Sequence, residues 1–569
     1  MKTKILRKRG RLFAVAPLLA AACVGTFLSV PAANAQESGL SLFPGNFFLP
    51  GNLVVSRSVY VDTGSITAGT TVLPPDCSLA NCPTPVTAVV NSAYPYVFNN
   101  DTVDGSFGIT SKIFLDQMTP FGLVFTSLQV PNSSQPGVTP TRDQLVTSFS
   151  SKSELALNLS TDGKALTFMG YVAPIGAIDA SNANTPEEID TTNPVGASYY
   201  RAVAQIETLG SFHFTLTNAY SGDNGRAAIL NNSSGANLFY AAGNAGNGSN
   251  PQPAGIILGA GAQIITPATV PEVAQAPVTP TPVASFNVTQ LGDKLDKIGK
   301  DTNFRGLTIF DNVLYYTKGS GSNGANTVYF VDTTGTVCTN TNGVGLPVPG
   351  ASLPTSPLAY NPTDLLTKGL DPNNMCILKG FPTLIAKSTS GVSYPFGIWF
   401  ANATTLYVAD EGSGTAGTTV ADFYAPATAA QNPTAGLQKW IFNSSAGEWE
   451  LAYTLTNGLN LGVPYTVPGY PTGNNSGTGG SNLPWAPATD GLRNITGVVN
   501  RDGIATIYAI TSTISGSGDQ GADPNKLVAI TDDLAATALP AKESFVTLKS
   551  AGYGEVLRGV SWTPGTVRP

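Results

Sequence analysis

The chain has 569 residues, of which only 11% are charged and 42% are hydrophobic, with 61 glycines, 42 prolines and a net charge of −7. So few charges exclude a disordered polyelectrolyte and a coiled coil, because both need abundant charged residues. Glycine and proline between segments rich in Val, Tyr and Phe favour short strands joined by turns.

The first 35 residues predict an export signal. Six basic residues precede an apolar stretch over 12–30, and a tripeptide of small residues follows at 33–35. This order is typical of a signal peptide, so we expect cleavage after Ala35 and a secreted or periplasmic mature chain. The competing reading, lipoprotein processing at Cys23, lacks the usual leucine three residues earlier. No later apolar run reaches the ~18 residues that a membrane-spanning helix needs.

Without this segment the chain has 23 basic and 36 acidic residues, a net charge of −13 that disfavours nucleic acid and anionic membranes as partners. Its four cysteines predict two disulfides in an exported chain, and proximity in sequence pairs Cys77 with Cys82 and Cys338 with Cys376. The only histidine is His213. A Ser-His-Asp triad or a multi-histidine metal site therefore has little support, and the balance leans away from an enzyme.

One pattern recurs along the chain: a short strand, a turn and an aromatic-rich strand, followed by two more strand-like runs. The first strands of the repeats are expected at 153–158, 226–230, 305–309, 397–400, 493–496 and 558–562. Four strands per repeat correspond to one blade of a β-propeller. The two later runs are expected at 256–258 and 286–289 in the repeat that begins at 226, and at 328–331 and 383–386 in the repeat that begins at 305.

The two ends of the chain complement each other. The first strand expected at 558–562 has no chain left to complete its blade. The mature chain opens instead with a second strand at 52–56 and continues with strands at 113–116 and 123–128. We therefore predict an all-β domain over 36–569, a six-bladed propeller whose terminal strands share one blade and so protect their edges. Seven blades is the alternative, if 250–283 contains another. The proline-rich stretch 266–283 predicts a stiff connector.

Aligning the repeats places an arginine at the start of four first strands. The aligned residues are Arg226, Arg305, Arg493 and Arg558, with Glu154 and Phe396 in the other two repeats. Because first strands line the channel of a propeller, these side chains are expected at one mouth. Guanidinium groups bind carboxylate, phosphate or sulfate through two bonds at once, which predicts a site for a small anion or an acidic saccharide.

The same alignment has a structural interpretation. Each arginine can instead pair with a carboxylate or a carbonyl of the next blade and hold the ring together, or serve both roles. Beside the arginine position lie Gly306, Gly397 and Gly559, which would allow a ligand to approach the backbone.

Oxygen-bearing side chains near the first strands give a weaker candidate site. Asn303, Asn494 and Glu555 are the expected ligands of a calcium ion, the candidate cofactor, because Ca²⁺ prefers carboxylate and amide oxygens. No Asp-x-Asp-x-Asp loop supports this site, and Asn and Asp are also common turn residues.

Two segments at the ends, 50–55 and 558–562, and the stretch 303–319 resemble a group of uncharacterised secreted bacterial and fungal β-propeller proteins. That resemblance implies the fold and export, and no activity. More distantly, 395–410 resembles blades of the lactonase and NHL propellers. A lactonase of that type implies calcium in the channel and a catalytic His or Asp, and this chain departs from the pattern because it lacks the histidine.

Together these patterns predict an exported binding or interaction protein with its site at the channel mouth. One alternative is a calcium-dependent hydrolase of the lactonase or phytase-like kind, which needs convergent carboxylates and usually a metal. Another is a structural surface or matrix protein, which needs neither the arginines nor a metal.

Overall fold

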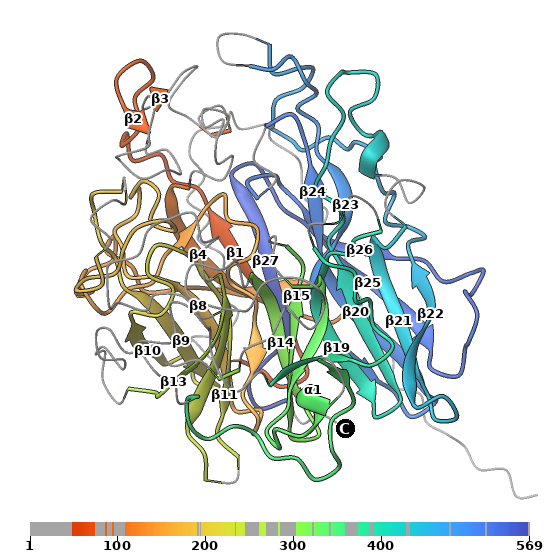
Figure 1. Ribbon diagram of the computed structural model, residues 1–569. Helices are drawn as coiled ribbons and strands as arrows, with labels where there is room; N and C mark the ends of the chain where they lie inside the picture. Colours follow the sequence, from red (N-terminus) through yellow and green to blue (C-terminus); the bar gives the residue numbers. More distant parts are fainter. Residues whose placement is uncertain are drawn as a thin grey trace, which may run out of the picture. The chain divides into compact units, whose positions relative to one another are not determined.

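Six small antiparallel sheets follow one another along the chain and form a six-bladed β-propeller with almost no helix (Figure 1). The computed structural model describes residues 48–73, 86–87, 94–95, 108–189, 193, 195–233, 235–244, 261–268, 283–284, 303–320, 324–340, 343–358, 374–386, 388, 391–427, 433–476, 480–517 and 521–566. All of them belong to the unit Ser41–Pro569. The expected signal peptide, Cys77, Cys82 and most of the connector at 266–283 lie outside these residues.

The first three blades are given from the channel outward. Blade one consists of β27 (Glu555–Trp562), β1 (Leu53–Val59), β4 (Thr110–Met118) and β5 (Val124–Gln129), with β6 (Thr147–Ser148) on β4. Blade two consists of β7 (Asn158–Leu159), β8 (Ala165–Tyr171), β9 (Arg201–Glu207) and β10 (Phe212–Thr217). Blade three has the described strands β11 (Gly225–Asn231), β12 (Leu238–Gly243) and β13 (Ala262–Ile265).

The other three blades follow the same order. Blade four consists of β14 (Phe304–Phe310), β15 (Val313–Lys318), β16 (Thr327–Val331), β18 (Met375–Leu378) and β17 (Val344–Gly345), with helix α1 (Val337–Asn340). Blade five consists of β19 (Pro395–Asn402), β20 (Thr405–Asp410), β21 (Gly436–Asn443) and β22 (Glu448–Leu455). Blade six consists of β23 (Ala488–Val499), β24 (Ile504–Ile514), β25 (Lys526–Asp533) and β26 (Val546–Ser550).

Outside the blades the structure has a short hairpin, β2 (Val72–Leu73) with β3 (Val86–Thr87), and the 3-10 turn η3 (Ala425–Ala427). Among the described residues, no helix has both the length and the apolar character to cross a bilayer.

The terminal strands close the ring as the sequence predicts. Strand β1 lies between β27 and β4, with Leu53 opposite Trp562 on one side and Met118 on the other. Both edges of β1 are therefore paired within the blade, which leaves neither available for another chain.

Hydrophobic side chains of the strands fill the space between neighbouring blades. One cluster joins blades six, one and two through Ile510, Val560 and Phe168, and another includes Tyr316 of blade four and Leu406 of blade five. Burial of each side chain of this size stabilises the folded protein by about 1.5–3 kcal/mol. The cores between blades thus hold the inner strands in place around the channel.

Two expected strands differ from the sequence prediction, and two more cannot be compared. The first strand of blade two is only Asn158–Leu159, because Leu155 has a left-handed backbone (φ 62°) that ends the extended run. In blade four the strand beside β16 is β18, not 383–386: the buried apolar run Met375–Leu378 pairs with β16, whereas Ile385 forms only an isolated bridge with Ala325. In blade three β13 pairs with β12, whereas 256–258 and 286–289 lie outside the described residues.

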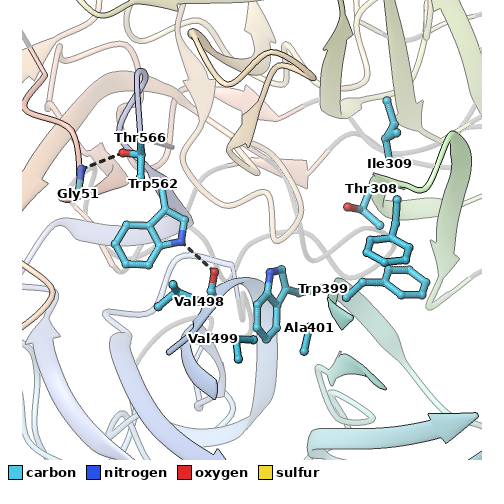
Figure 2. A pocket seen from close by; sticks show the side chains of 12 residues that line it. Gly51, Thr308, Ile309, Trp399, Ala401, Val498, Val499, Trp562 and Thr566 are labelled. Atoms are coloured by element: carbon cyan, nitrogen blue, oxygen red, sulfur yellow. Dashed lines mark hydrogen bonds between the residues drawn. The ribbon is translucent and has the colours of Figure 1, made fainter. Parts of the chain in front are cut away.

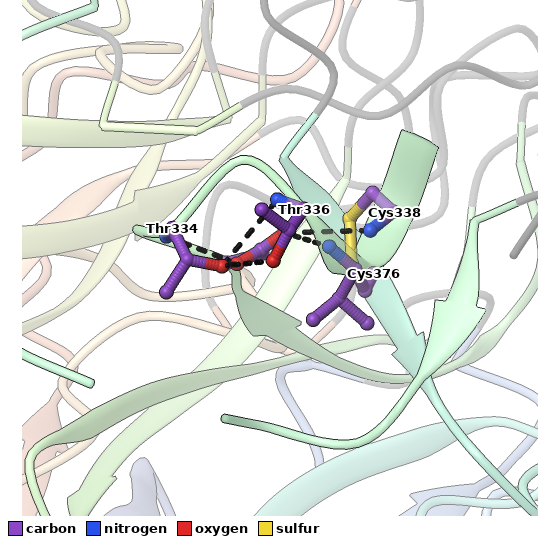
Figure 3. The surroundings of a disulfide bond; sticks show 6 residues. Thr334, Thr336, Cys338 and Cys376 are labelled. Carbon is purple, nitrogen blue, oxygen red and sulfur yellow. Dashed lines mark hydrogen bonds between the residues drawn. A yellow bond between two sulfur atoms is a disulfide. The ribbon is translucent and has the colours of Figure 1, made fainter. Parts of the chain in front are cut away.

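The expected disulfide between Cys338 and Cys376 is present and joins α1 to β18 across a sequence separation of 38 residues (Figure 3). Beside it, Asp332 accepts the backbone N–H of Thr334 at 3.0 Å and that of Val337 at 2.7 Å. These bonds satisfy N–H groups at the start of the short helix. A covalent closure of this loop restricts the unfolded chain and so stabilises blade four.

Candidate functional site

The six inner strands surround the channel in the order β7, β11, β14, β19, β23 and β27. Their starts lie at one mouth and their ends at the other, because each begins its blade. We call the first the polar mouth: it contains the four aligned arginines and Asp410, Glu411 and Asp490.

At the polar mouth two of the arginines share one carboxylate. Arg305 Nη2 lies 3.4 Å from Glu411 Oε1, and Arg493 Nε donates to Glu411 Oε2 at 3.2 Å. Burial alone would raise the pKa of Glu411, but the positive charges of Arg305 and Arg493 hold it below its usual range. Glu411 follows directly after β20, so this contact links the inner strands of blades four and six through blade five.

Arg558 holds backbone carbonyls, and its charge also acts on the carboxylate of Glu154. Its guanidinium donates to the carbonyl oxygens of Phe149 and Ser151, and its Nε donates to Ser58 Oγ at 3.3 Å. Charged donors on buried carbonyls satisfy acceptors that would otherwise be costly to bury.

Arg226 links blade three to blade four. Its Nη1 donates to Asn303 Oδ1 and to the carbonyl of Phe304 at 3.1 Å. All four aligned arginines are buried, and each contacts a neighbouring segment, so the structure contains the bracing contacts that the sequence offered as the second interpretation.

The remaining two aligned residues are also buried. Glu154 accepts hydrogen bonds from Thr147 Oγ1 at 2.6 Å, Ser148 N at 3.0 Å and Tyr171 Oη, and burial raises its pKa. The ring of Phe396 lies 5.9 Å from Arg305 Cζ, which is within the range of a cation–π contact.

A short stretch of chain, Phe149–Glu154, spans the polar mouth, and we call it the crossing segment. Besides the two carbonyls held by Arg558 of blade one, its Ser153 Oγ accepts from Arg305 of blade four. Asn224, just before blade three, donates to Ser151 Oγ at 3.5 Å. Because these contacts come from blades on different sides of the ring, the segment fills the space between the inner strands.

Lys152 of the crossing segment is half-buried and interacts electrostatically with two acids of the mouth. Its charge lowers the pKa of Glu411 and opposes the rise in the pKa of Asp490. The polar mouth thus places three cations, Arg305, Arg493 and Lys152, around Glu411.

The glycines beside the arginines have a different role from the expected one. A Cβ on Gly306 would lie 2.4 Å from the carbonyl oxygen of Phe396, and one on Gly559 would lie 2.3 Å from that of Leu155. Gly397 meets the carbonyl of Arg493 in the same way, at 2.5 Å. Backbone of the next blade therefore occupies the space that the sequence assigned to a ligand.

Sequence reasoning missed the acids of this mouth. Asp410 ends β20 and accepts the N–H of Tyr394 at 2.8 Å, and burial raises its pKa to about 6. Asp490 lies near the start of β23, and burial raises its pKa to about 7. Its Oδ2 accepts from Gly414 N at 2.8 Å, whereas its buried Oδ1 has no hydrogen-bond partner among the described residues.

The expected calcium ligands each have a separate partner. Asn303 accepts from Arg226, and Asn494 Oδ1 accepts from the N–H of Val560 at 2.6 Å. Glu555 pairs with Arg57 of β1. The structure therefore uses these oxygens to join strands and blades, and a calcium site remains a prediction.

Within the described part of the chain, one set of three His, Cys, Asp or Glu side chains places its ligand atoms within 4.8 Å of one another. It consists of Asp332, Cys338 and Cys376. Both sulfurs belong to the disulfide, so this set does not offer the thiolates that a metal would need.

The opposite mouth of the channel is an open hollow of about 620 Å³, lined by twelve residues that all lack charge (Figure 2). It lies where β14, β19, β23 and β27 end. Figure 2 shows the indole rings of Trp399 and Trp562 at this hollow, with Val498 between them. The tryptophans fall at the ends of the repeated first strands at 397–400 and 558–562, which is the sequence signal that could have located this hollow.

No protein-family profile matches the chain, and no curated protein matches its sequence. Among solved structures, the chain is similar to the periplasmic gluconolactonase PpgL of Pseudomonas aeruginosa, at 10% identity and a TM-score of 0.32, over 80% of this chain and 99% of that one. It is also similar to a polysaccharide lyase, a PL25 ulvan lyase bound to -[GlcA(1-4)Rha3S]-, at 9% identity and a TM-score of 0.29, over 87% and 96%. At these scores neither likeness bears on the function.

Proposed function

We propose that this propeller is an exported binding protein whose polar mouth takes a small anionic ligand, such as the carboxylate or sulfate of an acidic saccharide. The observation that carries the proposal is the convergence of three cations on Glu411: Arg305 and Arg493 contact its carboxylate, and the charge of Lys152 lowers its pKa and also acts on Asp490.

In this proposal the ligand anion competes with the carboxylate of Glu411 for the two arginines. Two guanidinium groups already held toward the position of one carboxylate suit a second anion, because their planar forks are fixed by the surrounding contacts. Lys152 is half-buried and lies on the crossing segment, so it offers a cation that solvent reaches. The arginines brace the blades and bind the ligand in this proposal.

The test is thermal unfolding with phosphate, sulfate, glucuronate and a neutral sugar. An anion present at about 100 times its Kd should add about 2.7 kcal/mol to the free energy of unfolding of the wild type. Lys152→Met should weaken binding about tenfold, because a charge-assisted bond contributes about 1.5–3 kcal/mol. The matched control is Lys164→Met, which removes the same charge from a side chain that is 78% exposed in the β7–β8 turn.

A second variant keeps the test informative. Glu411→Gln removes the competing carboxylate, so the same anion should stabilise this variant more than it stabilises the wild type. Equal anion responses in the wild type, Lys152→Met and Glu411→Gln would overturn the proposal, and so would no response of the wild type to any anion.

A hydrolase or lyase is the second candidate, and one observation favours it. Asp490, whose pKa is raised to about 7, and Glu411, whose pKa is lowered, lie in the same mouth. Carboxyl groups with opposite shifts are the usual arrangement for a general acid and a general base. Asp490→Asn distinguishes the candidates: it abolishes turnover of a glycoside or lactone substrate in an enzyme, and it leaves anion binding intact or stronger in a binding protein.

Export is the remaining part of the proposal, and it rests on the basic, apolar and small-residue pattern of 1–35. Mass spectrometry of the protein recovered outside the cytoplasm should give an N-terminus at Gln36. A lipid-modified N-terminus at Cys23 would show an anchored protein instead.

A further inference from the structure

The hollow at the second mouth has the size and the walls of a ligand site. Its volume of about 620 Å³ falls within the roughly 300–1,000 Å³ of pockets that hold small molecules. It is open to solvent between the ends of four inner strands, so a ligand needs no rearrangement of the blades to enter.

Both tryptophans contact one glycine of β23. A Cβ on Gly497 would lie 2.7 Å from the indole ring of Trp399, so only glycine lets that ring lie against β23. The carbonyl oxygen of the same Gly497 accepts a hydrogen bond from Trp562 Nε1 at 3.0 Å. This hydrogen bond fixes Trp562 and satisfies its polar atom within the protein. A ligand can therefore contact only the apolar part of this ring.

Trp399 is the indole with the more accessible surface. It is half-buried, and its ring packs on Tyr407 with the centroids 5.8 Å apart and the planes at 23°. Phe310 and Phe400 stack at 4.5 Å and form the wall beside it. Rigid aromatic rings contribute a large contact area at a small cost in conformational entropy, which suits them to bind a flat ligand face.

We propose that this hollow is a second binding site, which takes a ring of an uncharged saccharide. A sugar ring has an apolar C–H face that packs on an indole and a polar edge that hydrogen-bonds to hydroxyl and backbone groups. In the hollow, Trp399 can contact the apolar C–H face of the sugar, and the hydroxyl groups of Thr308 and Thr566 can bind its polar edge. Because none of the twelve lining residues carries a charge, a charged ligand would lose its hydration without gaining an ion pair there.

The proposal is independent of the anionic ligand of the polar mouth, because the two sets of residues occupy opposite ends of the inner strands. It is tested by isothermal titration of the whole mature chain with the neutral disaccharides maltose, cellobiose and lactose, and with Nile red as a purely apolar probe. At least one disaccharide should bind the wild type. Trp399→Ala should weaken this binding by about tenfold or more, since it removes the largest apolar contact.

Two further variants make the result specific. Ala401→Arg, at a half-buried position of the rim, should block the hollow while it leaves both tryptophans in place. Phe121→Ala removes an aromatic ring that is 91% exposed in the β4–β5 turn and should bind the disaccharide as the wild type does. The proposal is overturned if none of the disaccharides binds the wild type, if Trp399→Ala and Ala401→Arg bind as well as Phe121→Ala, or if Nile red binds and the disaccharides do not.

Discussion

At the polar mouth Arg305 and Arg493 share Glu411 and the crossing segment fills the space between the blades, whereas at the hollow the inner strands end on Trp399 and Trp562 around an open volume. Buried charges need partners, and here the chain supplies these itself, which fills the mouth with protein. Apolar side chains tolerate contact with water, so the hollow can remain open. The same repeated strand therefore produces a polar mouth that protein contacts fill and a hollow that stays open.

The largest effect is expected where the bracing depends on one carboxylate. Glu411→Gln leaves two buried guanidinium groups without the charge that they share, and breaking a buried ion pair in this way costs about 3–5 kcal/mol. Urea unfolding should show this loss. A loss below about 1 kcal/mol would mean that the arginines do not brace the ring through Glu411.

A matched pair of glycine substitutions compares the two mouths directly. Gly559→Ala places a Cβ against backbone atoms of Leu155 and Leu157, at 2.3 and 2.7 Å, and should cost about 3 kcal/mol because backbone cannot easily yield. Gly497→Ala meets only the indole of Trp399, which can turn, and should cost about 1 kcal/mol. Equal losses by thermal unfolding would show that the two mouths are equally rigid.

Part of the pH dependence of stability should come from the polar mouth. Burial raises the pKa of Asp490 from 3.8 to about 7, so the folded protein holds a proton that the unfolded chain releases. The stability that this proton provides is full below pH 3.8 and is lost as the pH rises through 7. Asp490→Asn has no proton to release at this position. At pH 8 the free energy of unfolding of the variant should therefore exceed that of the wild type by a few kcal/mol.

That comparison is made by urea unfolding at pH 5, 6, 7 and 8 with the wild type and the variant side by side. The two curves of unfolding free energy against pH should diverge from pH 5 to about pH 7 and run nearly parallel from there to pH 8. Curves that are parallel over the whole range would show that Asp490 is ionised throughout, and that the mouth already compensates its charge.

The smallest effect on stability is expected at the hollow. Ala401 is half-buried and packs at the edge of the core between blades five and six, but its side chain also lines the open hollow, so Ala401→Arg should cost less than about 1 kcal/mol of the free energy of unfolding. A loss of several kcal/mol would show that the hollow closes in solution.

Much of the fold could be predicted because each blade repeats the same local signals. Alternating apolar residues and Gly- or Asn-containing turns marked the inner strands β11, β14, β19 and β27, and the incomplete repeats at the two ends implied their pairing. Blade four departed from the pattern because the buried run Met375–Leu378, inside a long insertion, pairs with β16, and a disulfide joins it to α1.

The candidate site could be predicted only in part. Alignment of the repeats places the arginines, because it depends on sequence period alone. Glu411, which Arg305 and Arg493 share, follows the second strand of its blade rather than the first. The crossing segment is a serine-rich stretch whose sequence resembles that of any surface loop. Both meet the arginines only when the ring has closed, and contacts between non-neighbouring blades leave no periodic signal along the chain.

Closure of the ring also sets the order in which the protein can be completed. Ser56 of β1 accepts a hydrogen bond from Gly559 of β27, which lies 503 residues further along the chain. During synthesis one edge of β1 therefore stays unpaired until the chain has been made as far as β27. A chain that stops before β27 exposes this sheet edge, which another chain can then pair with.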